Sequence, residues 1–281
     1  MSYTMANSYL HFLPAAIFFA LPTTFIITYF WSVAEDHVYH VLPNISETGA
    51  LPPESCLFSM ILNLTAFTMP FSVYVRHKEI VEVFRAKRMS ETNPNAFWLN
   101  KSSTITGLIA CGSLDVLANF QEATEIGYIH QLASVICFYG SALYLLQQSV
   151  LSAWMVPEIS GQWLVNVRWF LGGLASLAVL GDTAFSSISY TYLYAEDEKS
   201  PIFANRTAHW TPETPGFVWH CISSVTQYVV VLALGAYIFT FCWDFKKITI
   251  FAPEIEMRTE PIPEPVQSLR YMTVEKPKTY S

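Results

Sequence analysis

The chain has 281 residues, of which 52% are hydrophobic and 13% are charged, and its mean hydropathy is +0.33. A soluble domain typically carries about a quarter charged residues, so this composition excludes an ordinary soluble domain and indicates a membrane protein. The net charge of −7 excludes little, because in a membrane protein the position of each charge matters more than the sum. The five cysteines stand singly, so the sequence contains no zinc-binding motif.

Apolar runs of about 20 residues predict six membrane-spanning helices. They cover about residues 12–33, 55–75, 102–119, 126–155, 164–189 and 217–242. The third run is the weakest, because it is short and rich in Ser, Thr and Gly. We therefore expect an all-α, polytopic transmembrane domain over residues 1–250. The tail, residues 251–281, is rich in Pro and Glu without an apolar period, so it is expected to be disordered.

The basic residues predict the orientation of the spans. Of the 15 Lys and Arg residues, all but Lys199 and Arg206 lie between spans two and three, beside span five or after span six. By the positive-inside rule, this distribution places both termini and the tail in the cytosol. The first and fifth loops then face the lumen. Two glycosylation sequons fall on that side, at Asn44 and Asn205, and their occupancy stays open because both lie close to the bilayer.

Polar groups gather toward the lumenal ends of the spans. Ionisable side chains within a span cost on the order of 2.5–3.5 kcal/mol at mid-bilayer on insertion scales, so they are candidate functional residues. Asp115 and Asp182 stand out in the third and fifth spans. With their neighbours they form a candidate lumenal cluster: Asp115, Asn119, Gln121, Glu122, Glu125, His130, Asp182, His209 and His220.

The role of this cluster stays open between four interpretations. Pairing between helices is the favoured one; binding of a polar headgroup, sensing of lumenal acid through His, and metal-dependent hydrolysis of a lipid are the others. The chain has no HExxH, GxSxG or other compact catalytic motif. We therefore expect a protein that is not an enzyme and that carries no metal and no other cofactor.

Three further features concern covalent chemistry and traffic. Cys56 and Cys221 lie near lumenal span ends, where either a disulfide or, preferably, free thiols are expected. A basic stretch that follows span two is either a solvated loop or a contact for anionic lipids, through Arg76, Lys78, Arg85, Lys87 and Arg88. In the tail, Tyr271 and Val274 match the tyrosine-x-x-hydrophobic form of a sorting signal that adaptors read.

The first lumenal loop, PNISETGALPPESC, ends as a helix entry. Pro52-Pro53 suits a helix start, where a missing N–H costs little, and Glu54 complements the positive end of the helix dipole. The middle of the loop has no such local explanation. It either closes as a lid over Asp115, His130 and His220 or packs as a cap, and packing is favoured; its residues are Ser46, Glu47, Thr48 and Gly49.

Four stretches, in order along the chain, resemble the damage-regulated autophagy modulator (DRAM) family within the wider Frag/DRAM/Sfk group of six-span proteins. They are LPNISETGALPPESCLFSMILN, YVRHK, ANFQEAT followed by His130, and HWTPETPGFVWH with DFKKI after it. Together they cover about residues 10 to 250. Asp115 and the long basic loop 79–101 depart from the family pattern, and the tail is not matched.

The resemblance implies a non-enzymatic membrane protein that promotes or modulates autophagy at lysosomal or endosomal membranes, with the plasma membrane or Golgi as the alternative. More distant members of the group are linked to lipid handling: phosphoinositide kinase recruitment, GPI-anchor lipid remodelling and lipid asymmetry. That is the second hypothesis, using the lumenal cluster or the basic loop. The expected partners are the lipid bilayer, anionic lipid headgroups and sorting adaptors, with no nucleic acid; the sequence names no direct protein partner.

Overall fold

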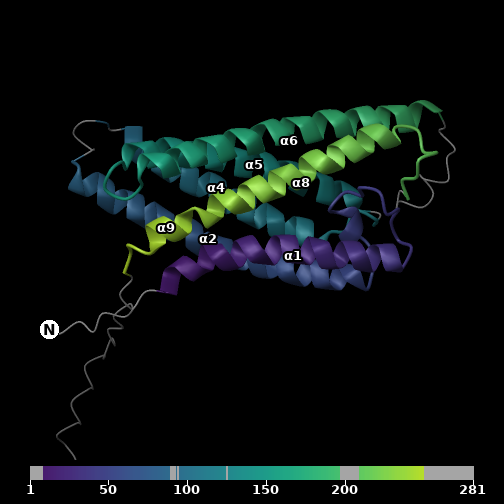
Figure 1. The fold of residues 1–281 in the computed structure, drawn as a ribbon, viewed down its shortest axis with the longest axis horizontal. Helices are drawn as coiled ribbons and strands as arrows, with labels where there is room; N and C mark the ends of the chain where they lie inside the picture. Colours follow the sequence, from purple (N-terminus) through teal and green to yellow (C-terminus); the bar gives the residue numbers. More distant parts are fainter. Residues whose placement is uncertain (1–8, 89–92, 94, 125, 197–208, 250–281) are drawn as a thin grey trace, which may run out of the picture. The chain divides into compact units, whose positions relative to one another are not determined.

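The computed structural model describes residues 9–88, 93, 95–124, 126–196 and 209–249. Six long helices dominate this part of the chain, which contains no strand (Figure 1). The all-α prediction is therefore confirmed. The long helices are α1 (Phe12–Ala34), α2 (Glu54–Ala86), α4 (Asn95–Asn119), α5 (Gly127–Trp154), α6 (Gln162–Glu196) and α8 (Phe217–Phe239). Shorter elements are η1 (Tyr9–His11), η2 (Glu47–Gly49) and α9 (Phe241–Phe245).

Each predicted span corresponds to one long helix, but three helices, α2, α4 and α6, run well beyond the apolar runs. α2 continues past residue 75 to Ala86, and its extension packs Ile80 and Phe84 into a buried cluster with Leu151 and Met155. The extension stays helical because it has an apolar face to bury, although its charged residues end the hydropathy signal. The predicted helix entry is confirmed, since α2 begins at Glu54.

Length and composition allow five of the described helices to cross a membrane, alone or with a short adjoining turn. They are Tyr9–Ala34, Glu54–Ala86, Gly127–Trp154, Gln162–Ala195 and Phe217–Phe245. Among the long helices described, α4 is the one that does not qualify, in line with the weakness of the third predicted span. α4 packs between α2 and α5, so its crossing of the bilayer stays a prediction that the arrangement favours.

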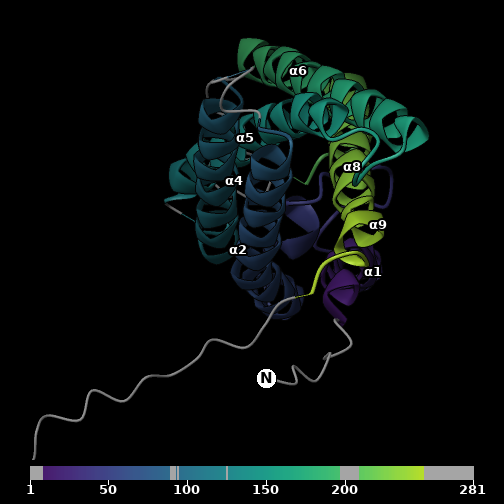
Figure 2. The same cartoon turned by 90° about the vertical axis from the view of Figure 1, so that its left-hand side faces the viewer.

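The six long helices form a closed ring in chain order. α1 packs on α2, α2 on α4, α4 on α5, α5 on α6 and α6 on α8, and α8 returns to α1 (Figure 2). Large apolar side chains point outward from this ring, as a bilayer requires; they include Phe19, Phe67, Leu132, Phe170 and Leu177.

The bundle has two chemically different ends. η1 contacts α9, so the first and last described residues lie at the same end, which we name the arginine end. All nine described Lys and Arg residues, from Arg76 to Lys247, lie at this end. The opposite end carries the first loop and is named the loop end. This one-sided distribution is the one that the positive-inside rule uses, and the assignment of the arginine end to the cytosol stays a prediction.

The first loop enters the ring of helices as a plug, residues 43–49. Ile45 and Thr48 are buried, and the Ile45 N–H donates to Oε1 of Gln227 at 2.7 Å. The Tyr228 hydroxyl donates to the Pro43 carbonyl at 2.8 Å, and the Thr28 and Thr48 hydroxyls lie 3.1 Å apart. The middle of the loop is therefore a packed cap, as the sequence favours.

Gly49 provides a test of the plug. A Cβ added there would lie 2.3 Å from the Phe58 ring, which is itself buried, so Gly49→Ala must push the ring or lift the plug. Overpacking of this kind costs about 1–3 kcal/mol, and we expect a lower melting temperature for the purified protein in detergent. Gly112→Ala is the control, because a Cβ there meets nothing within 4 Å. Equal melting temperatures for the two variants would contradict the packing of the plug.

Candidate functional site

His130 fastens the plug to the turn between α4 and α5. Its ring is buried, and Nδ1 lies 2.7 Å from the Phe120 carbonyl and 3.1 Å from the Leu117 carbonyl. Nδ1 must therefore carry the proton, because a carbonyl oxygen can only accept. Nε2 lies 3.0 Å from the Ser46 hydroxyl, which donates to it in this tautomer. The imidazole thus joins three segments of backbone.

His220 lies against the plug, at the start of α8. Its ring stacks on Trp210, with centroids 4.3 Å apart and an interplanar angle of 8°. Its Nε2 lies 3.3 Å from Oε2 of Glu47, and that oxygen also accepts the Asn44 N–H at 2.9 Å. Ser46 and Glu47 therefore reach two of the three residues that a lid would cover, His130 and His220 but not Asp115, while the loop as a whole is packed.

A polar cavity of about 220 Å³ lies between α5, α6 and the plug. Asp182 and Glu122 are its carboxylates: Oδ1 of Asp182 accepts the Ser223 hydroxyl at 2.8 Å, and Oε1 of Glu122 accepts Nε2 of Gln131 at 2.9 Å. Hydroxyl and amide groups make up most of the remaining wall, including Ser46, Ser134, Ser186, Tyr190 and Gln227. The cavity is the part of the predicted cluster with room for a ligand.

The structure does not bring the whole predicted cluster to this cavity. Asp115 is exposed on α4, and Asn119 pairs with Asn63 of α2 through amide contacts of 3.0 and 2.9 Å. Gln121 donates to the Ser59 hydroxyl at 3.0 Å, and His209 is half-buried away from the cavity wall. The prediction was wrong for Asp115 and Asn119: topology gave their level in the bundle, but the rotation of α4 turns them outward.

Other predicted features have mixed outcomes. The Asn44 side chain lines the cavity and accepts the Ser224 hydroxyl at 2.6 Å, so a glycan on it would have to displace this contact. Cys56 and Cys221 are both free, without the disulfide. Glu125, Asn205, Tyr271 and Val274 lie outside the described residues. The described residues contain no group of three or more potential metal ligands, so the metal-hydrolase interpretation gains no support.

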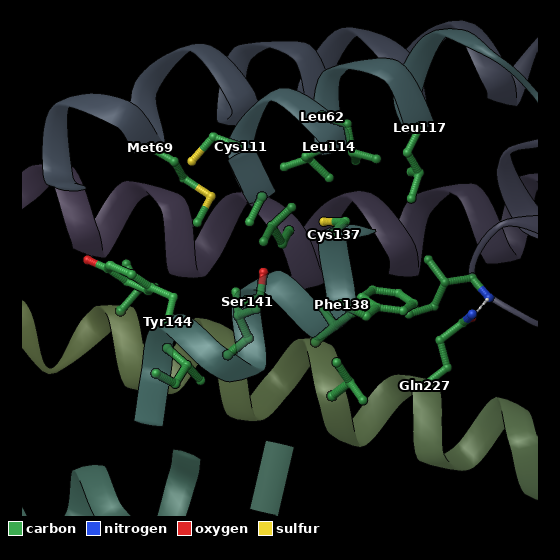
Figure 3. Close-up of a pocket in the computed structure, with 18 of the residues that line it drawn as sticks. Leu62, Met69, Cys111, Leu114, Leu117, Cys137, Phe138, Ser141, Tyr144 and Gln227 are labelled. Atoms are coloured by element: carbon green, nitrogen blue, oxygen red, sulfur yellow. Dashed lines mark hydrogen bonds between the residues drawn. The ribbon is translucent and has the colours of Figure 1, made fainter. Parts of the chain in front are cut away.

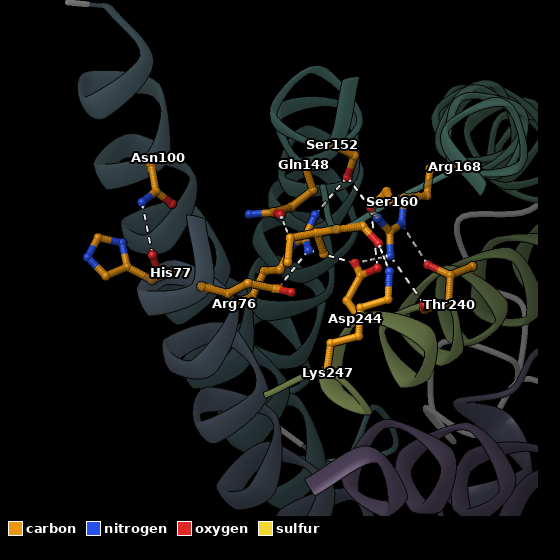
Figure 4. A network of polar contacts seen from close by, with 12 residues as sticks. Arg76, His77, Asn100, Gln148, Ser152, Ser160, Arg168, Thr240, Asp244 and Lys247 are labelled. Atoms are coloured by element: carbon orange, nitrogen blue, oxygen red, sulfur yellow. Dashed lines mark hydrogen bonds and ion pairs between the residues drawn. The ribbon is translucent and has the colours of Figure 1, made fainter. Parts of the chain in front are cut away.

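The arginine end contains a buried ionic network that sequence analysis missed (Figure 4). Arg76 of α2 and Arg168 of α6 are both 0% exposed. One oxygen of Asp244 in α9, Oδ2, accepts an N–H from each guanidinium at 2.6 Å. Glu79 adds a second carboxylate, 2.7 Å from Arg76, so two positive and two negative charges balance formally.

Neutral groups complete this network. The guanidinium of Arg76 donates to Oε1 of Gln148 at 3.0 Å and to the Ser152 hydroxyl at 2.8 Å. Arg168 makes four further contacts, which are to the hydroxyls of Ser152, Ser160 and Thr240 at 3.0, 2.9 and 2.9 Å, and to the Thr240 carbonyl at 3.2 Å. Buried charges are tolerated when they are paired and hydrogen-bonded, and most polar atoms of this network are; Oε1 of Glu79 is the buried oxygen that has no donor among the described residues.

The network also corrects the predicted contact with anionic lipids. Arg76 is enclosed, so it cannot reach a headgroup, and Lys87 is held by Glu158 at 2.6 Å and by two backbone carbonyls. Lys78, Arg85 and Arg88 remain exposed. The missed signal is Arg168, because an arginine at the edge of an apolar run predicts a partner in the bundle.

The family model described as the Frag1/DRAM/Sfk1/Cwh43P N-terminal domain matches residues 9–248. The chain belongs to this family. DNA damage-regulated autophagy modulator protein 2 of Bos taurus is 30% identical over 241 residues, which is 86% of this chain and 86% of that protein.

Two further relatives match within the Frag1/DRAM/Sfk1 family. DNA damage-regulated autophagy modulator protein 1 of Homo sapiens is 27% identical over 231 residues, covering 80% of this chain and 87% of that protein. A modulator of macroautophagy, TMEM150B of Danio rerio, is 30% identical over 129 residues, covering 46% of this chain and 51% of that protein. No solved structure matches significantly.

The stretches that carry the DRAM resemblance meet in pairs across the bundle. At the loop end, Glu47 of the first stretch faces His220 of the fourth at 3.3 Å. At the arginine end, Arg76 of YVRHK binds Asp244 of DFKKI at 2.6 Å. The segments that resemble the family are thus the ones that hold each end of the ring together.

Asp244→Asn tests the network at the arginine end. The substitution keeps the shape but leaves two buried guanidiniums without their shared carboxylate, and breaking a buried pair in this way typically costs 3–5 kcal/mol, so roughly that loss is expected. The melting temperature in detergent should fall strongly. Glu82→Gln is the control: its pair with Arg85 at 2.8 Å is 67% exposed on both sides and is worth about 0–1 kcal/mol. Equal melting temperatures for Asp244→Asn and Glu82→Gln would show that the network does not stabilise the fold.

Glu122 gives the loop end a dependence on pH. Burial, reinforced by the charges of Glu47 and Asp182, raises its pKa to about 7. An unfolded chain releases this proton near about pH 4.3, so between the two values folding takes up a proton and stability falls as pH rises.

Replacement of Glu122 by Gln removes this titration. We expect the melting temperature of the wild type to rise, relative to that of Glu122→Gln, as pH is lowered from about 7.5 to about 5. Comparing variant with wild type at each pH cancels the contributions of the other titrating groups. The exposed Glu213, replaced by Gln, serves as the control. The same pH dependence in Glu122→Gln and wild type would show that Glu122 is not held in a buried, proton-retaining environment.

Proposed function

We propose that this protein modulates autophagy as a non-enzymatic, multi-pass protein of the lysosomal or endosomal membrane. The observation that carries the proposal is the extent of the family match, residues 9–248, which includes every described helix. The relatives that match over most of this chain are named autophagy modulators. Such a bundle acts by binding other molecules at its surfaces and sites within the membrane.

The arrangement of polar groups supports a role without chemistry of its own. His130 is engaged by two carbonyls and a hydroxyl, and His220 is stacked on Trp210 beside Glu47. The imidazole of His130, with both ring nitrogens engaged, positions the plug and is not free to act as a general base. At the arginine end, the guanidinium N–H groups of Arg76 and Arg168 donate hydrogen bonds to partners within the bundle.

A second candidate function, lipid handling, is favoured by the polar cavity at the loop end. Polar side chains in a lipid-embedded protein normally mark a site or a path. The version that uses the basic stretch is weaker, because only Lys78, Arg85 and Arg88 of the five predicted residues stay exposed.

Localisation and autophagic flux test the first proposal. In cells deleted for the gene, we expect slowed turnover of the lipidated autophagosome marker, measured with and without a lysosomal inhibitor. The full chain should restore turnover and coincide with lysosomal or endosomal markers. Unchanged flux in the deleted cells would refute autophagy modulation.

The sorting-signal prediction is tested in the same cells. Tyr271→Ala should move the tagged protein toward the plasma membrane, because an adaptor reads the tyrosine ring. Thr273→Ala, at a position between Tyr271 and Val274 that the motif leaves free, is the matched control. Identical distributions of both variants and the wild type would remove this signal from the account of localisation.

A further inference from the structure

Asp115 carries its carboxylate on the outer face of the ring, on α4. The side chain is exposed and makes no hydrogen bond or ion pair within the described part of the chain. Its backbone carbonyl accepts Nδ2 of Asn119 at 2.7 Å, so the local bonding uses the main chain and leaves the carboxylate free. The described Lys and Arg residues lie at the arginine end, so none of them neutralises this charge.

The packing of α4 fixes the outward direction of this carboxylate. Figure 3 shows Cys111 and Leu114 of α4 on the wall of an apolar cavity inside the ring. On the same inner face, a Cβ added at Gly107 would lie 3.0 Å from the Tyr144 ring of α5, so the two helices are in close contact there. A rotation of α4 that turned Asp115 inward would remove these apolar contacts.

The pairing of α4 with α2 gives the depth of Asp115. The side-chain amides of Asn119 and Asn63 bond to each other at 3.0 and 2.9 Å, and the two helices run antiparallel. Because both helices rise equally per residue, Asp115 lies near the level of Phe67, one turn further from the loop end. Span two is predicted over about residues 55–75, so this level is close to the middle of the span.

A carboxylate that faces lipid at this depth is unfavourable. Phe67 and Leu64 of α2 are 69% and 58% exposed, so the surface at this level is the apolar surface that a bilayer covers. Asp115 lines neither the polar cavity at the loop end nor the apolar cavity inside the ring. Charged side chains within a membrane nearly always face protein or pair with one another. A partner for Asp115 therefore has to come from another molecule.

The outer face of α4 carries a narrow exposed stripe along the whole helix. Its residues recur at alternating spacings of three and four, which is the spacing of a helix–helix seam. This α4 stripe consists of Trp98, Lys101, Ile105, Leu108, Gly112, Asp115 and Asn119. A Cβ added at Gly112 would meet nothing within 4 Å, so the bare backbone there leaves room for another helix to approach closely.

The composition of α4 also suits a helix that is covered by protein on both faces. Among the long helices described, α4 is the one that is not apolar enough to qualify as a span by itself. Helices of this kind are stabilised in membranes by packing and by polar contacts with other helices. The inner face of α4 has such contacts within the ring, and the α4 stripe is the face that lacks them.

A second copy of this chain does not supply the missing cation. Two copies in one membrane share an orientation, so contact between their α4 helices would bring both Asp115 carboxylates to the same depth, where they repel. Among the described residues, no Lys or Arg lies at that depth. A basic side chain of a different protein would be attracted, and burial between two helices strengthens the attraction because the local dielectric constant is low.

We propose that the α4 stripe is the docking surface for a transmembrane helix of another protein, one that carries a Lys or Arg side chain at the depth of Asp115. The basic group pairs with the Asp115 carboxylate, and the backbone of the partner approaches at Gly112. Ile105 and Leu108 pack against its apolar side chains. This inference goes beyond the proposed function, because docking by the purified chain does not depend on a role in autophagy.

Designed peptides test the chemistry of the partner. The purified full-length chain is reconstituted in vesicles of phosphatidylcholine, which has no net charge, with a Leu-rich peptide of about 20 residues that spans the bilayer. The peptide carries a photoactivatable Leu and, at its centre, Lys, Leu or Glu. The Lys peptide should cross-link about fivefold more than the other two, with the products on α4 or on its neighbours α2 and α5. Equal cross-linking of the Lys and Leu peptides, or products confined to other helices, would overturn the proposal.

Variants of Asp115 test the ion pair. Asp115→Asn should reduce cross-linking of the Lys peptide to the level of the Leu peptide, and Asp115→Lys should reverse the preference in favour of the Glu peptide. Glu213→Gln, which removes an exposed carboxylate outside the α4 stripe, should behave as the wild type does. An unchanged preference for the Lys peptide in a folded Asp115→Asn protein would refute the pairing.

Gly112 tests the close approach of the partner helix. Gly112→Leu fills the bare position and should weaken cross-linking of the Lys peptide about fivefold. Gly173→Leu on α6 is the matched control, because an added Cβ there also meets nothing within 4 Å. Equal yields for the two variants would show that the peptide does not dock at the α4 stripe.

Melting temperatures and self-association are measured on the same samples. Asp115→Asn should not lower the melting temperature, because the carboxylate has no partner within the described part of the chain. If this variant fails to fold, the comparison of the Lys and Glu peptides on the wild type decides the outcome. Cross-linked dimers of the chain alone that involve α4 and disappear in Gly112→Leu would overturn the proposal, because the stripe would then join two copies.

Discussion

Two arginines that share one carboxylate oxygen connect the helices at one end of the bundle. Arg76 comes from α2, Arg168 from α6 and Asp244 from α9, so this contact unites segments that are far apart in the chain. The Phe241 ring lies beneath both guanidiniums, at 5.0 and 5.2 Å from their central carbons. The ring face offers negative quadrupole density to both cations, and it excludes water from the pairs.

The loop end is held by a different principle. There, side chains of α8 bond the plug's backbone at Ile45 and Pro43, and His130 of α5 bonds the Ser46 hydroxyl. Non-helical backbone at this depth is tolerated only when protein groups replace water as partners. Paired charges therefore stabilise the arginine end of the ring, and hydrogen bonds to the plug stabilise the loop end. The polar cavity lies at the loop end.

Sequence alone predicted the positions of the helices better than the directions in which their side chains face. Apolar runs reveal a span whatever its neighbours are, so each span matched a helix, whereas the extension of α2 was missed because Arg76 and Glu79 resemble a loop. The distribution of charge and the topology place Asp182 and Asp115 toward the same end of the bundle. Of the two, only Asp182 faces the cavity. Which way a side chain faces depends on helix rotation, and rotation is decided by packing between helices that a single sequence does not display.

The closure of the ring has a consequence for how the chain is made. Each helix packs on its predecessor, so most of the bundle can assemble in the order of synthesis, with little waiting for distant partners. Asp244 is the exception, because it emerges after both arginines that need it. Until α9 is made, Arg76 has Glu79 of its own helix as its carboxylate partner, whereas Arg168 has none among the described residues. A chain stopped short of α9 would therefore leave Arg168 as a buried cation without a carboxylate partner, so the arginine end of the ring becomes stable only after Asp244 has been added.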